Sequence, residues 1–157
     1  MPLDPRDFLK LAERLYKDEN YQDINEAKLR TAISRSYYAA FLILRETLKE
    51  RLVNTQLSEY FKAIYRSGAI HGCVKEILDE IDDFLGKLYG KLRKERNRSD
   101  YNLNESITPE DVEYIIEVAK EIIKQAPNLS IEPSRISNII MKYHNRINKD
   151  KQITNAW

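Results

Sequence analysis

A chain of 157 residues can bury the core of one domain, and its net charge of +1 leaves any nucleic-acid role to a local basic patch. Few glycines and prolines leave little room for the turns of an all-β fold, while abundant Leu, Ile, Lys, Glu and Arg favour helices. One cysteine excludes an internal disulfide, and no apolar run approaches the roughly 18–20 residues of a membrane span, so we expect a cytoplasmic protein without membrane contact.

Apolar residues recur every three or four positions along the first half of the chain, which predicts a series of helices. Asp4 before Pro5 is typical of a helix start, and the apolar face that follows ends near Asp18. Asn25 can cap a second, long helix that runs to about residue 52. A short helix is expected at roughly 57–66, before a turn with two glycines.

In the second half, one apolar stripe begins near Ile70, passes Leu92 and predicts one long helix, followed by a loop. Thr108-Pro109-Glu110-Asp111 is a strong helix start. A weaker helix is expected at about 133–148, with a polar, frayed end. We therefore predict an all-α, antiparallel bundle of four to five core helices at 1–126, with a C-terminal helical extension at 127–157.

The second predicted helix contains the stretch "SRSYYAAF", which mixes small and aromatic residues. Small residues allow a second helix to approach closely, so helix packing explains most of the pattern. A binding role for Tyr37 or Tyr38 stays open. Arg35 lies off the apolar stripe and is expected to be solvated or to face a partner subunit.

The end of the long helix carries six basic residues against one acid between Lys87 and Arg98. Cations at a helix C-terminus interact favourably with the helix dipole, which explains most of them. Arg96 is different, because it continues the apolar stripe inward and needs an acceptor there. The candidates are Asp100, a carboxylate elsewhere in the bundle, or a phosphate, which the fixed fork of an arginine suits.

"SRSYYAAF" followed by "RKERNRSDY" at the end of a later helix resembles the HEPN (higher eukaryotes and prokaryotes nucleotide-binding) domain, and more closely the small stand-alone HEPN proteins of bacteria and archaea. The resemblance covers roughly residues 5–126. It implies a homodimer through the central helices. It also implies an Arg-x4–6-His motif that, in many members, meets its copy at the dimer cleft and cleaves RNA without a metal. Such members often act as toxins beside a small nucleotidyltransferase, or in defence against phage.

Arg96 and Asn97 match the start of that motif, but positions 101–103 hold Tyr, Asn and Leu in place of the histidine. The histidine would serve as acid and base near neutral pH, whereas tyrosine ordinarily titrates near 10. Its absence argues against strong nuclease activity. In the toxin branch the partner transferase can adenylylate a tyrosine near the motif's end, and Tyr101 is the nearest candidate; packing in the loop is the alternative.

The sequence therefore favours an RNA- or nucleotide-phosphate-binding subunit that acts with a nucleotidyltransferase-type partner in a toxin–antitoxin or defence system. The alternatives are a metal-independent HEPN ribonuclease with Arg96, Asn97 and Tyr101 in catalysis, and a non-catalytic dimeric scaffold. No metal site or cofactor motif is expected. Binding is assigned to five residues: Tyr38, Arg93, Lys94, Arg96 and Arg98.

Overall fold

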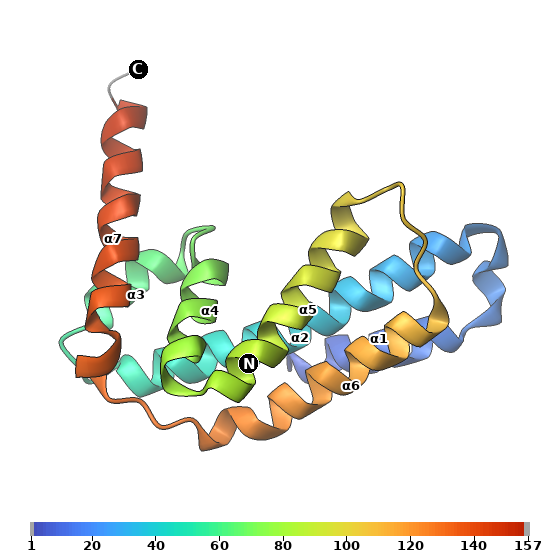
Figure 1. Ribbon diagram of the computed structural model, residues 1–157, viewed down its shortest axis with the longest axis horizontal. Coiled ribbons are helices and arrows are strands. Elements are labelled where there is room, and N and C mark those ends of the chain that lie inside the picture. The colour runs from blue at the N-terminus through green and yellow to red at the C-terminus, as the bar shows by residue number, and fades with distance from the viewer. Residues whose placement is uncertain (1, 156–157) are drawn as a thin grey trace. The chain divides into compact units, whose positions relative to one another are not determined.

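The computed structural model describes the backbone of residues 2–155 and the side chains of residues 2–152 (Figure 1). These residues form helices and no strand, which confirms the predicted all-α helical bundle. The α-helices are α1 (Arg6–Lys17), α2 (Asn25–Leu52), α3 (Ser58–Tyr65), α4 (Ile70–Ile81), α5 (Asp83–Tyr101), α6 (Pro109–Gln125) and α7 (Pro133–Asn155). Two short 3-10 helices, η1 (Glu19–Ile24) and η2 (Ala126–Asn128), join them.

The contacts within the chain divide it into two compact units. The first unit joins the chain up to Ile43 to the segment Lys87–Pro127. The second joins Leu44–Gly86 to the chain from Asn128 onward. The predicted boundary between residues 126 and 127 stays a prediction.

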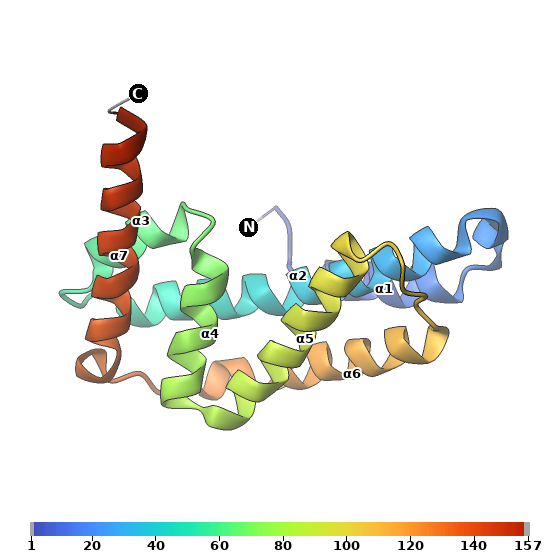
Figure 2. The same ribbon diagram turned by 45° about the horizontal axis from the view of Figure 1, so that its top comes forward.

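In the first unit, α1 packs beside α6, as Figure 2 shows, and the early turns of α2 supply much of the core. The predicted start of α6 is confirmed: Thr108 accepts a hydrogen bond from the Asp111 N–H, and the Asp111 carboxylate accepts one from the Thr108 N–H. The buried core side chains include Leu9, Leu29, Ile33, Tyr37, Tyr89, Leu92, Val112, Ile115, Ile116 and Ile122.

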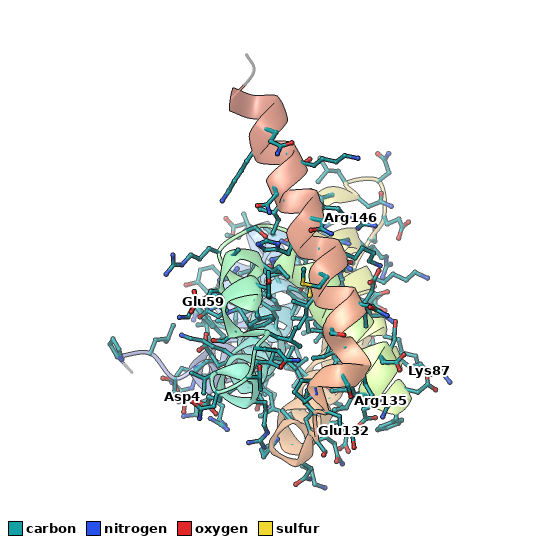
Figure 3. The ribbon with its side chains drawn as sticks, turned by 90° about the vertical axis from the view of Figure 1, so that its left-hand side faces the viewer. Asp4, Glu59, Lys87, Glu132, Arg135 and Arg146 are labelled. Atoms are coloured by element: carbon teal, nitrogen blue, oxygen red, sulfur yellow. The ribbon has the colours of Figure 1, made fainter. Side chains whose placement is uncertain are left out.

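In the second unit, α7 packs against α3 and α4. Figure 3 views α7 from its outer side, where Arg135 donates to the main-chain oxygen of Glu80 on α4. Lys142 pairs with Glu76, also on α4, so charged contacts flank the apolar packing. The buried side chains here include Leu48, Leu52, Phe61, Ile64, Val74, Ile77, Ile136 and Ile140.

The prediction of one long helix from Ile70 is wrong in one respect, because α4 ends at Ile81 and a separate helix, α5, begins at Asp83. Asp82 leaves the helical conformation, with φ −154° and ψ 89°, and its carboxylate accepts a hydrogen bond from the Leu85 N–H. The apolar stripe gave no sign of the break, because its spacing continues across both helices. The acidic run there supplies the cap of the second helix.

The ends of two helices also differ from expectation. Residues 99–101, predicted to open a loop, form the last turn of α5. α7 continues to Asn155, beyond its predicted end near residue 148. Among the described residues, no helix is both long enough and apolar enough to cross a membrane.

Candidate functional site

Arg96 lies on the inner side of α5, as the apolar stripe predicts, with only 16% of its side chain exposed. Its two terminal nitrogens donate to Asn97 Oδ1 at 3.2 Å and to the Tyr38 hydroxyl at 3.1 Å. Its Nε lies 2.9 Å from Asp100 Oδ2, so the pair is an ion pair, but the N–H is not aligned for a hydrogen bond. Asp100, one of the candidates that the sequence suggested, is therefore the ion-pair partner of Arg96.

Aromatic rings surround this guanidinium. Its central carbon lies 5.4 Å from the ring centroid of Tyr37, 5.6 Å from that of Tyr38 and 5.7 Å from that of Tyr101. Contacts of this length are cation–π interactions, which also hold the planar group in a fixed orientation. Tyr101 is nonetheless 71% exposed. Behind them, the buried hydroxyls of Tyr37 and Tyr89 share a hydrogen bond of 2.9 Å.

The electrostatics of the cluster keep Arg96 charged and the inner tyrosines neutral. Burial opposes the charge of Arg96, but charge interactions with Tyr38 and Asp100 outweigh it and raise the pKa of the guanidinium. Burial also raises the pKa of Tyr37 and raises that of Tyr89 well above its ordinary value. Neither of these two buried tyrosines is therefore suited to act as a base.

A second arginine joins the same aromatic group. The guanidinium of Arg35 lies 5.3 Å from the ring centroid of Phe8 and 4.9 Å from that of Tyr38. Arg35 is half-buried rather than fully solvated, and its predicted alternative, a contact with a partner subunit, stays a prediction. Arg35 and Arg96 therefore share the ring of Tyr38, which places two permanent cations beside one carboxylate, that of Asp100.

The other predicted binding residues do not all join this cluster. Arg98 forms ion pairs with Glu95, Glu105 and Asp111, and the hydrogen bonds to Glu105 and Glu95 raise its pKa. These ion pairs link Arg98 to the loop after α5, so its charge is already paired within the protein and less suited to bind a ligand. Arg93 is half-buried, and Lys94 and Asn97 are exposed on the same helix.

Arg30 on α2, which sequence reasoning missed, fixes the end of α5. Its guanidinium donates to the main-chain oxygens of Ser99 and Asn102, both at 2.9 Å, and to that of Glu105. The same side chain pairs with Glu26 one turn earlier on α2. The carbonyls at a helix end need such donors, because they have no partner within the helix. Nothing in the local sequence reveals the contact, since the partners are about 70 residues apart.

The remaining reactive side chains lie in the second unit. His144 packs edge-on against the Tyr60 ring, with 4.9 Å between ring centroids, and the half-buried His71 belongs to α4. Cys73 is buried, and burial raises the pKa of its thiol to about 12, which makes it unreactive. No group of His, Cys, Asp and Glu among the described residues could hold a metal ion.

Comparison with known proteins supports the resemblance that the stretches "SRSYYAAF" and "RKERNRSDY" suggest. The HEPN domain family matches residues 5–129. The chain belongs to the HEPN domain family. Two uncharacterized proteins of Methanocaldococcus jannaschii are similar to it, one 33% identical over 88% of this chain and 96% of its own length. The other is 31% identical over 92% of this chain and 88% of its own length. No solved structure matches the chain.

Membership of the HEPN family supports a HEPN-type role, which is often that of a ribonuclease or a nucleotide-binding protein. The arginine–asparagine pair of the motif is present and structurally held. The position of the motif's histidine is occupied by Tyr101, Asn102 or Leu103, depending on whether four, five or six residues separate it from Arg96. What the cluster can do chemically is therefore to bind an anion and stabilise its charge.

Proposed function

We propose that this HEPN protein binds a phosphate of RNA or of a nucleotide at Arg96. The observation that carries the proposal is the guanidinium itself, oriented by Tyr38 and Asn97 and kept charged. Its two terminal nitrogens carry four N–H groups, and the hydrogen bonds to Tyr38 and Asn97 use two of them. The other two are suited to a bidentate contact with phosphate oxygens.

Competition from Asp100 sets the strength of this contact. The carboxylate already offsets the charge of Arg96, so an incoming phosphate competes with Asp100 for the guanidinium. Arg35, which lies against the rings of Phe8 and Tyr38, adds a second positive charge. The arrangement favours moderate, salt-sensitive affinity, because phosphate contacts displace counterions.

The proposal includes a homodimer and a protein partner. Tyr101 and Leu103 are 71% and 81% exposed beside the cluster, and exposed apolar side chains next to a charged site are suited to a protein contact. We propose that a second copy covers them, and that a nucleotidyltransferase-type partner acts with the dimer in a toxin–antitoxin or defence system. Light scattering that gives the monomer mass at micromolar concentration would contradict the dimer.

The central experiment measures binding of single-stranded RNA and of ATP to the full chain, by fluorescence anisotropy and calorimetry, across a salt series. Arg96→Lys keeps the charge but loses the fork, and we expect its affinity to fall about tenfold, the equivalent of about 1.4 kcal/mol. Lys124→Gln removes an exposed charge of α6 and serves as the control. If both variants bind like the wild type, or if nothing binds, Arg96 is not a phosphate site.

A metal-independent ribonuclease is the second candidate, favoured by Arg96 and Asn97 at the start of the family motif. Incubation with tRNA and total RNA in the presence of EDTA tests it. Cleavage that disappears in Arg96→Ala would support the nuclease. If RNA binds but stays intact, the ribonuclease is excluded and RNA binding without cleavage is the function.

A further inference from the structure

A groove runs along the end of α5 within the first unit, with a cavity volume of about 420 Å³. This volume falls in the range of about 300–1,000 Å³ that small-molecule sites occupy. Its lining comes from α2, the end of α5 and the loop that follows. The lining residues that matter here are Thr31, Ser34, Arg35, Ser99, Asp100 and Leu103.

Ser99 is the anomaly in this lining. The side chain is almost fully buried, at 2% exposure, yet its hydroxyl makes no hydrogen bond to any described residue. Other helical hydroxyls of this unit behave differently: Thr31 donates to the Ala27 carbonyl at 2.7 Å, and Ser36 donates to the Ala32 carbonyl at 2.8 Å. A buried hydroxyl without a partner is destabilising, so a fold that keeps one in a groove points to a ligand that completes it.

The position of Ser99 relates it to the phosphate site. Ser99 follows Arg96 by three residues on α5, so the two side chains are neighbours on the helix surface. Asp100, the partner of Arg96, lines the same groove. Ser34, on the α2 side, is 7% exposed and lies with its hydroxyl 3.5 Å from a terminal nitrogen of Arg35.

We propose that Ser99 binds the 2′-hydroxyl of the ribose that follows the phosphate at Arg96. The inference rests on the proposed function and assigns the preference for RNA over DNA to one residue, Ser99. A ribose 2′-hydroxyl both donates and accepts, as a serine hydroxyl does, and it is the group by which proteins distinguish RNA from DNA. Arg35, whose guanidinium lies against the rings of Phe8 and Tyr38, lines the same groove and adds a positive charge beside the proposed phosphate.

The test compares a single-stranded uridine oligonucleotide with a deoxyuridine oligonucleotide of the same length, by fluorescence anisotropy with the full chain. The wild type should bind the RNA about three- to tenfold more tightly, the factor that one hydrogen bond contributes. Ser99→Ala should bind RNA as weakly as DNA, with its DNA affinity unchanged. Its melting temperature should be equal or higher, because the variant removes a buried hydroxyl that has no partner in the free protein.

Thr31→Val is the matched control, because it deletes a hydroxyl that lines the same groove but already bonds to Ala27. It should keep the preference for RNA. Three results would overturn the ribose contact and leave Arg96 as a phosphate site. They are equal binding of both oligonucleotides by the wild type, a preference for RNA that survives in Ser99→Ala, and a preference for RNA that is lost in Thr31→Val. A fall in DNA affinity and melting temperature together in Ser99→Ala would overturn it too. Binding of neither oligonucleotide would also overturn the ribose contact, and the phosphate site at Arg96 would fall with it only if ATP failed to bind as well.

Discussion

Asp100→Asn is expected to weaken the fold and strengthen anion binding at the same time. The Nε–Oδ2 distance of 2.9 Å corresponds to about 1.4 kcal/mol of attraction in water and about 6 kcal/mol at an effective dielectric constant of 20. Because 16% and 25% of the two side chains are exposed, we take the pair at about 1–2 kcal/mol. Asp100 also lies in the last turn of α5, where a negative charge opposes the helix dipole by about 0.3–1 kcal/mol. The net loss in the free energy of unfolding should be about 1 kcal/mol.

Binding should change in the opposite direction. A phosphate about 6 Å from the Asp100 carboxylate would be repelled by about 0.7 kcal/mol in water, which is about threefold in affinity. Removing the carboxylate also frees Arg96 from a competing partner, so threefold is the smaller end of the expected gain. The two effects have one cause, the charge of Asp100.

Urea unfolding and RNA anisotropy measure the two effects on the same preparations. Glu110→Gln is the matched control, because it removes the same charge from an exposed position in the first turn of α6. It should leave RNA affinity nearly unchanged. Asp100→Asn that binds RNA more weakly than the wild type would refute the reasoning, since Asp100 would then contact the ligand rather than compete with it.

Two further predictions concern stability. Gly86→Ala should lower the free energy of unfolding by about 1–2 kcal/mol, because its Cβ would lie 3.0 Å from the Asp79 nitrogen and this overpacking outweighs the roughly 1 kcal/mol gained in helix propensity. Gly68→Ala, whose Cβ would meet nothing within 4 Å, should leave the free energy of unfolding unchanged or raise it. Equal urea midpoints for the two variants would contradict this prediction. The free energy of unfolding should also fall as pH rises above about 10, because the unfolded chain then releases protons that Tyr37 and Tyr89, whose pKa values are raised, retain when folded. The double variant Tyr37→Phe/Tyr89→Phe should show a smaller alkaline loss, and an identical pH profile would count against the assignment.

The sequence predicted the helices that local chemistry determines. The start of α6 follows from Thr108 and Pro109, whose capping roles need no distant partner. The inward position of Arg96 follows from helical period alone, and so does its pairing with Asp100 one turn later. These features lie within a few residues of each other, so a single sequence contains their whole cause.

What the sequence did not reveal depends on partners far along the chain. The stacking of Arg35 on Phe8 and the contact of Arg30 with the end of α5 both join separate helices. Ser99 had one local signal that was missed, its place three residues after Arg96. The break at Asp82 also had a signal, an acidic residue able to cap the next helix, but the uninterrupted apolar spacing concealed it.

The hydrogen bonds from Arg30 to the end of α5 and the loop after it limit the transfer of the motif to another protein. Residues 91–102 look like a self-contained segment, yet four of the main-chain carbonyls in and after it accept hydrogen bonds from a guanidinium of another helix. A graft of that stretch onto a foreign helix would carry the arginine and the asparagine but leave their backbone unsupported. A chimera that keeps the cluster's geometry must therefore transplant Glu26 and Arg30 together with it.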